Sequence, residues 1–159
     1  MLVRRFRLGD EHALWRVFHS AIHLIAIRDY TSDQVRAWAP EDIDPTLWRQ
    51  RMEAINPFVA EHDGQIVGYA DLQPTGYIDH FFVSGHHPRQ GIGSLLMATL
   101  HNEAHDHEVR ELTSDVSLTA QPFFARHGFV VVEHRTPAQQ GVVVPNARMR
   151  KALGKAVEA

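Results

Sequence analysis

The stretch from Val83 to Ser94, VSGHHPRQGIGS, constrains the fold most, because a strand, a short polar loop and a helix start follow one another directly. The residues that follow predict a helix from about Gly91 to His105. Its inward positions recur at helical spacing and are Ile92, Leu95, Leu96, Thr99 and Leu100. Free N–H groups at a helix start favour an anion. Gly91 and Gly93 let the backbone approach it closely, and Arg89 adds positive charge. This loop is a candidate pyrophosphate site.

The glycine pair alone does not identify the ligand, since a Gly-x-Gly before a helix is often only a tight turn. No Gly-Lys-Ser/Thr follows, so the loop is not a Walker motif. The third glycine of a Rossmann fingerprint is also missing, and the loop lies mid-chain after a strand meander.

The flanking segments predict the other elements. A first strand at 2–7 precedes a helix that Asp10 caps and that extends to Ile25. Thr31 and Gln34 form a capping box for a second helix, and Asp44-Pro45 opens a third. Asp63-Gly64 predicts a hairpin turn between two strands, and residues 77–83 predict a third strand of the meander.

The rest of the chain predicts a strand at 109–116, a helix at 119–127 closed by Gly128, and strands at 129–134 and about 142–150. A meander followed by a β-α-β crossover predicts a mixed sheet flanked by helices. We therefore expect an α/β (α+β) fold in a single domain, residues 1–159.

Composition excludes several function classes. A net charge of −3 without a Lys/Arg run gives no basic face for nucleic acid, and the lack of cysteine removes thiolate chemistry. No apolar run resembles a signal peptide or a membrane span, so we expect a cytoplasmic protein without a membrane partner. His101 and His105 share a helix face but lack the zinc-protease pattern, so we expect a solvated face and no metal site.

A second segment, Ser117 to Phe129 (SLTAQPFFARHGF), completes a recognisable pair with the glycine loop. Together they resemble the two signatures of the GNAT N-acetyltransferase superfamily, Val-(x)4-Gln/Arg-x-x-Gly-x-Gly/Ala and Asn-x-x-Ala-x-x-x-Tyr-x-x-x-Gly-Phe. The resemblance covers nearly the whole chain. It implies a mostly antiparallel central sheet with a splayed strand pair that holds acetyl-CoA (coenzyme A). The cofactor-binding residues it implies are Phe81, Phe82, Val83, Arg89, Gln90, Gly91, Ile92, Gly93, Ser94, Ser117, Phe123 and Phe124.

Three residues depart from this pattern. Pro88 stands where the family usually has Gln or Arg, and Ser117 stands where Asn is common. Phe124 replaces the Tyr that often protonates the departing thiolate, so another donor or water must serve, or the thiolate leaves unaided. These departures leave open a non-catalytic acyl-CoA sensor as an alternative to an enzyme.

The resemblance implies direct attack of an uncharged amine on the thioester in a ternary complex. Asp79 occupies a position where relatives often carry an acidic base, and two acidic residues precede Phe-Phe-Val in the similar polyamine acetyltransferases. The second residue here is His80, whose ordinary pKa suits proton transfer. Asp79 and His80 are therefore the catalytic candidates. Asp79 could instead bind loop amides, and His80 could be a buried core histidine.

Tyr30 and Trp38 lie in the region that builds the acceptor pocket in this family, and Asn146 is a further candidate. Tyr and Trp stack on apolar or cationic acceptors, although core packing is their commoner role. We expect a small-molecule amine acceptor if this pocket is closed and aromatic, and a protein amine if it is an open groove. The family habit also suggests a homodimer paired through C-terminal edge strands.

Overall fold

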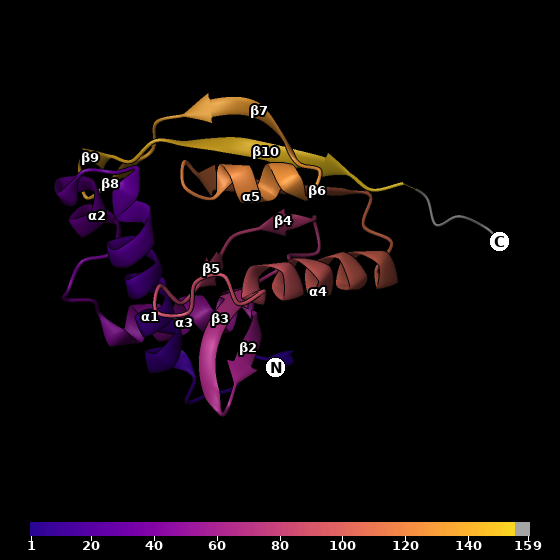
Figure 1. Cartoon of the computed structure of the whole chain (residues 1–159), viewed down its shortest axis with the longest axis horizontal. Helices are drawn as coiled ribbons and strands as arrows, with labels where there is room; N and C mark the ends of the chain where they lie inside the picture. The colour runs from indigo at the N-terminus through magenta and orange to yellow at the C-terminus, as the bar shows by residue number, and fades with distance from the viewer. Residues whose placement is uncertain (155–159) are drawn as a thin grey trace.

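The computed structural model describes residues 1–154, and it contains two four-stranded sheets (Figure 1). The first sheet is antiparallel, in the order β1 (Leu2–Arg5), β2 (Phe58–His62), β3 (Gln65–Ala70) and β5 (Phe81–Val83). The second has the order β4 (Tyr77–Ile78), β6 (Glu111–Ser117), β10 (Asn146–Ala152) and β7 (Val130–Arg135), with β4 parallel to β6. A small hairpin joins β8 (Ala138–Gln139) to β9 (Val142–Val143). Residues 155–159 of the expected domain lie outside the described residues.

Five α-helices accompany the sheets in the described part of the chain: α1 (Glu11–Ser20), α2 (Ser32–Trp38), α3 (Pro45–Ile55), α4 (Ile92–Asp106) and α5 (Gln121–Arg126). A π-helical turn, η1 (Ala21–Ile25), and a 3₁₀ turn, η2 (Ala26–Arg28), extend α1. Within residues 1–154, none of these helices is long and apolar enough to cross a membrane. The mixed α/β architecture expected from the sequence is confirmed.

The helix starts follow local rules with one exception. Thr31 and Gln34 form the predicted capping box, and the Asp44 carboxylate accepts hydrogen bonds from the first turn of α3. Asp10 is the N-cap residue of α1 as expected, but its side chain makes no capping hydrogen bond. Its carboxylate instead accepts hydrogen bonds from the Arg7 amide at 2.9 Å and the Arg4 guanidinium at 2.8 and 3.0 Å, so it is already occupied.

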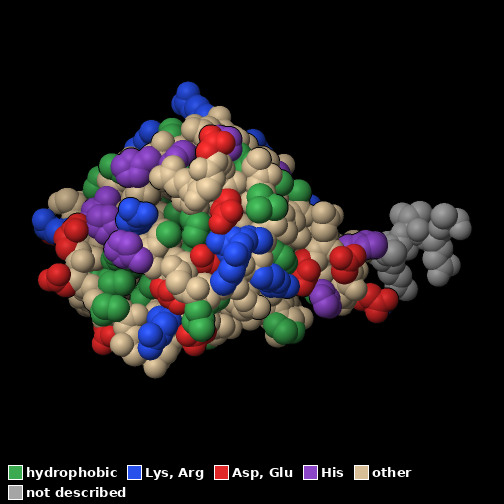
Figure 2. Space-filling view, turned by 90° about the horizontal axis from the view of Figure 1, so that it is seen from below, with side chains coloured by type: hydrophobic (Ala, Val, Ile, Leu, Met, Phe, Trp, Pro, Cys, Tyr) green, Lys and Arg blue, Asp and Glu red, His purple; other side chains and the backbone are tan. Residues whose placement is uncertain are grey.

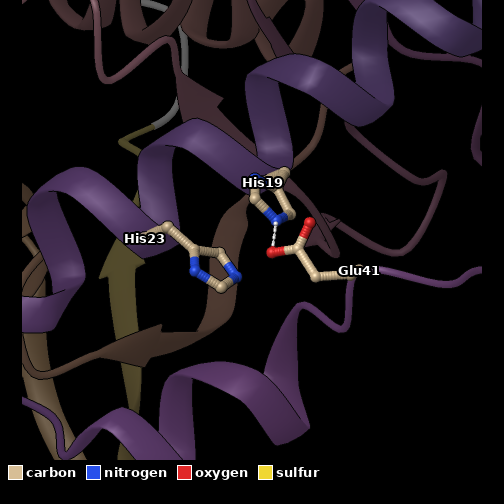
Figure 3. A group of neighbouring side chains, drawn as sticks. All are labelled: His19, His23 and Glu41. Carbon is tan, nitrogen blue, oxygen red and sulfur yellow. Dashed lines mark hydrogen bonds and ion pairs between the residues drawn. The ribbon is translucent and has the colours of Figure 1, made fainter.

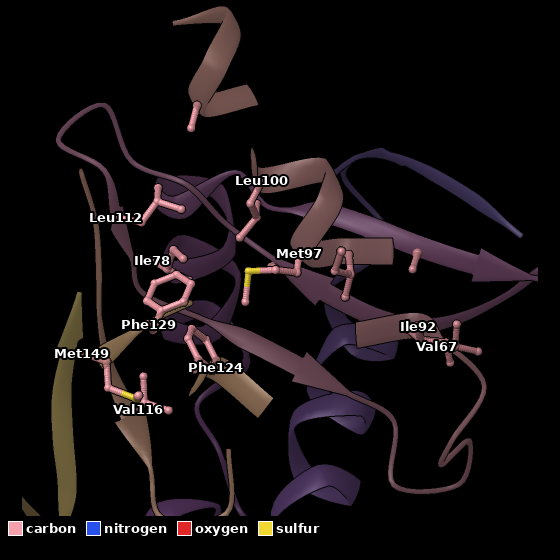
Figure 4. Close-up of a cluster of buried hydrophobic side chains, with 14 residues drawn as sticks. Val67, Ile78, Ile92, Met97, Leu100, Leu112, Val116, Phe124, Phe129 and Met149 are labelled. Carbon is pink, nitrogen blue, oxygen red and sulfur yellow. The ribbon is translucent and has the colours of Figure 1, made fainter. Parts of the chain in front are cut away.

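Two buried apolar clusters hold the layers together. In the first, Met97 and Leu100 of α4 meet Val67 of one sheet and Ile78 and Leu112 of the other (Figure 4). In the second, the helices α1 to α3 pack on the opposite side of the first sheet. A Cβ at Gly68 would lie 2.9 Å from Cγ2 of Ile92, so glycine lets the start of α4 lie directly on β3.

The single strand expected at 77–83 is wrong, because β4 pairs in the second sheet and β5 in the first. Asp71, a fully buried residue, causes the break: its carboxylate accepts hydrogen bonds from the amides of His80 at 2.6 Å and Asp79 at 3.1 Å. Burial raises the pKa of Asp71 to about 6, although these hydrogen bonds lower it. The two sheets therefore separate after Ile78, which leaves one edge of β5 without a strand partner.

β7 lies at the edge of the second sheet and exposes Val130, Val131 and Val132. The expected pairing of C-terminal strands between two copies would use such an edge, and it stays a prediction.

Replacing Asp71 tests the role of this carboxylate. We expect Asp71→Ala to lower the free energy of unfolding by about 2–4 kcal/mol, because two buried amides lose their acceptor. Asp71→Asn keeps an acceptor and removes a buried charge, so it should cost less. Urea unfolding of the three proteins measures both differences, and equal stability of the two variants would contradict this account.

Candidate active site

Two cavities meet where the sheets separate. The first, here the charged cavity, has a volume of about 380 Å³ and is lined by residues that include Phe18, Arg51, Tyr77, Asp79, His80, Asp115, Arg135 and Asn146. The second, here the apolar cavity, has a volume of about 330 Å³ and is lined by residues that include Ile22, Ile25, Phe81, Val83, Arg89, Gly93, Thr119 and Phe123. Trp38, Phe82 and Ser117 line both. A group held at these three residues is therefore open to both cavities.

The start of α4 lies at the apolar cavity. Gly91 is its N-cap, with a φ of 77°, a left-handed conformation that favours glycine. Within residues 1–154, no side chain accepts a hydrogen bond from the first amides of α4, at Ile92, Gly93 and Ser94. Arg89 lines the cavity and carries the only positive charge on the loop between Ser84 and Gly91. The helix start thus offers free N–H groups and one guanidinium to an anion.

The other residues predicted around this loop lie in different settings. Gln90 and Ser94 are exposed next to Gly91. The side chain of Ile92 is buried in the core, so only its amide is available to a ligand. A Cβ at position 93 would lie 3.2 Å from the Phe123 ring, so Gly93 makes room for that ring.

The apolar cavity also contains an unused polar atom. The hydroxyl oxygen of Thr119 is buried and has no hydrogen-bond partner among the described residues. A buried hydroxyl without a partner is costly, and a polar ligand in the cavity would satisfy it. The Ser117 hydroxyl, by contrast, already accepts a hydrogen bond from the Ala120 amide at 3.1 Å. Sequence analysis missed Thr119 because it occupies an unspecified position of the second signature, between Ser117 and Ala120.

Phe124 is almost fully buried and packs against Phe81, Phe123 and Phe129, at centroid distances of 5.5, 5.9 and 5.0 Å. Its ring lines the apolar cavity. The ring carries no exchangeable proton, so position 124 supplies shape and no acid.

Ion pairs dominate the charged cavity. Asp79 pairs with Arg51 at 2.8 Å. Asp115 pairs with Arg148 at 2.9 Å and Arg135 at 3.5 Å. Burial opposes ionisation of Asp115, but the hydrogen bonds and charge of Arg148 outweigh it and lower the pKa. Sequence reasoning missed Asp115, although its alternation with buried Ser114 and Val116 on β6 places it on the half-buried face.

The His80 side chain is partly buried and packs among Phe18, Trp48 and Phe82. Its Nδ1 lies 3.0 Å from the Tyr69 hydroxyl. Burial lowers the pKa of His80 to about 4, and the nearby Asp79 carboxylate only partly offsets this. The imidazole is therefore neutral at neutral pH. His80 is thus a partly buried, hydrogen-bonded histidine that also forms part of the wall of the charged cavity, and its catalytic role stays a prediction.

Tyr30 and Trp38 both line the charged cavity, with ring centroids 5.4 Å apart. The Tyr30 hydroxyl donates a hydrogen bond to the Pro145 carbonyl at 2.5 Å and accepts one from the Leu118 amide at 2.9 Å. That hydroxyl therefore ties two loops together, and the ring remains for contact with a ligand. Asn146 presents a buried Oδ1 that has no hydrogen-bond partner among residues 1–154.

Comparison with known proteins decides the family. Residues 26–153 match the family model described as an acetyltransferase (GNAT) domain. The chain belongs to the GNAT superfamily. It is an acyltransferase that uses acetyl-CoA as the acyl donor, and the resemblance of its two signature segments to that family is confirmed.

Two relatives are similar over most of their length. YafP of Escherichia coli K12, described as an uncharacterized N-acetyltransferase, is 32% identical over 148 residues, which is 93% of each chain. A GCN5-related N-acetyltransferase from Rhodopseudomonas palustris is 27% identical, with a TM-score of 0.91 over 96% of this chain and 95% of that one. The PaiA N-acetyltransferase from Thermoplasma acidophilum, solved with coenzyme A, shares the fold at 15% identity, with a TM-score of 0.73 over 96% and 98%.

The burial of His80 in this GNAT chain predicts a pH dependence of stability. Its folded pKa of about 4 lies below the unfolded value near 6.5, so the stability it contributes is complete above pH about 6.5 and is lost as the pH falls through about 4. The unfolding free energy of the native chain minus that of His80→Gln should therefore rise with pH across this window, by up to about 1.4 kcal/mol per unit.

Urea unfolding at several pH values measures this difference, and the contribution of Asp71 cancels because both proteins contain it. His105→Gln, altered at the exposed end of α4, is the control for loss of a histidine. A flat difference between pH 4 and 6.5 would show that His80 titrates normally in the folded chain.

Proposed function

We propose that this enzyme transfers the acetyl group of acetyl-CoA to the primary amine of a small molecule. The observation that carries the proposal is that two cavities of different character share Trp38, Phe82 and Ser117. The apolar cavity suits the donor and the charged cavity suits the acceptor. Their junction would bring the amine to the thioester, and holding both there supplies much of the rate.

The residues around the apolar cavity fit acetyl-CoA. The free amides at the start of α4 and the Arg89 guanidinium would hold the pyrophosphate. β5 pairs only with β3, so the other edge of Phe81–Val83 would hydrogen-bond the pantetheine arm, with the Thr119 hydroxyl as a further partner. When bound, acetyl-CoA supplies the activated acetyl group.

In this proposal His80 accepts the proton of the amine, and Asp79 is its charged neighbour. An alkyl amine is protonated at neutral pH, so a base must take its proton. His80 lines the charged cavity and lies next to Phe82 at the junction, with ring centroids 5.5 Å apart. Its pKa of about 4 makes the imidazole a weak base, so it would relay the proton to water and not retain it. Asp79 is held by Arg51, which leaves it suited to orienting the amine. Phe124 provides no acid at the usual position, so water would protonate the departing group.

The charged cavity favours a small acceptor over a protein amine. Its volume of about 380 Å³ is in the lower range of small-molecule pockets, and Phe18, Tyr30 and Trp38 line it. Its two carboxylates, Asp79 and Asp115, are both paired with arginines. An acceptor that carries an anionic group beside its amine would match this mixture of charges.

Blocking the helix start tests the donor site. We expect the native chain to bind acetyl-CoA with micromolar affinity, and Gly91→Glu to weaken binding at least about tenfold, because a carboxylate would stand where the pyrophosphate is expected. Calorimetry measures both affinities. Gly64→Glu is the matched control, since Gly64 also has a positive φ, 73° against 77°, and also has open space around it, but lies in the hairpin turn. An absence of binding by the native chain at millimolar ligand would refute the donor site.

Removing the unpaired amide tests the acceptor site. Asn146→Ala should lower kcat/KM for the acceptor about tenfold, the effect of one hydrogen bond to a charged group, and leave the KM for acetyl-CoA unchanged. Steady-state kinetics against a panel of zwitterionic, neutral and polycationic amines measures the effect and ranks the acceptors. Asn102→Ala, on the exposed face of α4, is the control. An equal loss for both substrates would place Asn146 outside the acceptor site.

A further inference from the structure

His19, His23 and Glu41 form a compact group outside both cavities (Figure 3). Each side chain offers one ligand atom, and the three atoms lie within 4.8 Å of one another. The His19 Nε2 lies 2.9 Å from Oε1 of Glu41. The two imidazole rings are stacked, with centroids 3.9 Å apart and planes inclined by 14°. Two imidazole rings and one carboxylate thus lie close enough together to share one ion once the side chains rotate.

The local backbone produces this convergence. His19 lies in the last turn of α1, and His23 lies in the π-helical turn that follows it. Residues four apart share a helix face, and π-helical turns are rare and frequently occur at functional sites. Glu41 comes from the segment between α2 and α3, opposite that face. The His23 Nε2–H donates a 2.6 Å hydrogen bond to the Ala39 carbonyl in the same segment, which holds the two sides together.

We propose that His19, His23 and Glu41 bind one divalent transition-metal cation, with Zn²⁺ as the representative ion. Two imidazoles and a carboxylate are a ligand set that zinc uses, whereas magnesium and calcium prefer oxygen ligands alone. Zinc bonds of about 2.1 Å in a tetrahedron separate ligand atoms by about 3.4 Å, so modest side-chain rotations close the group around an ion. The cation takes the place of the protons on the two Nε2 atoms, so the hydrogen bond from His23 to the Ala39 carbonyl is exchanged for a bond to the metal.

The surroundings suit a cation. The side chains of His19 and Glu41 are 26% and 76% exposed, so an ion reaches the group from solvent and keeps a position open for water. Among residues 1–154, this is the only set of three histidine, aspartate or glutamate side chains with such spacing. Figure 2 shows several histidine side chains gathered at the left of the molecule, the side on which Figure 1 places α1 and α2. The expectation that the chain has no metal site considered only His101 and His105, on α4.

A cation here would crosslink α1 to the segment after α2. Trp38, which lines both cavities, is the last residue of α2 and lies three residues before Glu41 in the same segment. Metal binding would therefore stabilise the folded chain beside the active site. The site does not depend on the acceptor or on the route of the amine proton, so it is tested separately from the proposed reaction.

Calorimetric titration of the tag-free full chain with ZnCl₂ tests the site. We expect one ion per chain, and His23→Gln and Glu41→Gln should each weaken binding at least about tenfold. The matched control is the double variant His101→Gln/His105→Gln, which removes another histidine pair spaced four apart on a helix and should bind as the native chain does. Thermal unfolding gives an independent readout, because Zn²⁺ should raise the melting temperature of the native and control proteins and not of the two site variants.

Two results would overturn the proposal. The first is the absence of saturable binding by the native chain at millimolar Zn²⁺. The second is binding that survives in His23→Gln and Glu41→Gln and is lost in the control. The circular dichroism of each variant without metal establishes that it is folded, so that a loss of affinity reports on the ligands.

Discussion

The rest of this structure depends on one buried carboxylate that accepts hydrogen bonds from two backbone amides. Asp71 directly follows β3, and its carboxylate accepts hydrogen bonds from the amides of Asp79 and His80. Without these bonds, the two amides would be free to continue a strand. A continuous strand would close the sheet and leave no gap beside β5. Because the carboxylate replaces strand pairing, β4 joins one sheet and β5 the other, and the free edge of β5 faces the apolar cavity. The same hydrogen bonds fix the backbone of both catalytic candidates, so the free edge of β5 and the positions of Asp79 and His80 have one cause.

Close approach is the second constraint, and glycine makes it possible. At Gly68 a Cβ would meet Ile92, and at Gly85 it would lie 2.3 Å from the Ser20 carbonyl oxygen. The first allows α4 to lie on β3, and the second allows the loop before α4 to lie against the end of α1. The helix start, β5 and the π-helical turn therefore surround one apolar cavity, although they come from distant parts of the sequence.

Local sequence patterns predicted the features that a few neighbouring residues determine, such as helix caps, turns and helices. The capping box at Thr31, the hairpin at Asp63-Gly64 and the long helix after Gly91 were all confirmed, because each is determined by a few adjacent residues. The break after Ile78 was missed because its cause, Asp71, lies several residues upstream and acts through the backbone. The partners of the site acids were missed for the same reason, since Arg51 and Arg148 reach Asp79 and Asp115 from other elements. The sequence signals available were the alternation of buried and half-buried residues on β6 and the polar side chains Asn146 and Arg148 on β10.

These arginines bear on the acceptor more than the acids themselves do. Asp79, which precedes His80 and Phe-Phe-Val, resembles the first of the two acidic residues at this place in polyamine acetyltransferases, in which unpaired carboxylates would attract a polycation. Here Arg51 neutralises Asp79, while Arg135 and Arg148 together outweigh the charge of Asp115. A polycation would have to compete with these arginines for both carboxylates and would meet their positive charges in the cavity. An amine with its own anionic group can instead bind between the existing pairs, its ammonium beside a carboxylate and its anion beside an arginine. On the proposed function, charge balance within the cavity, and not the identity of any one acid, would therefore select the acceptor class.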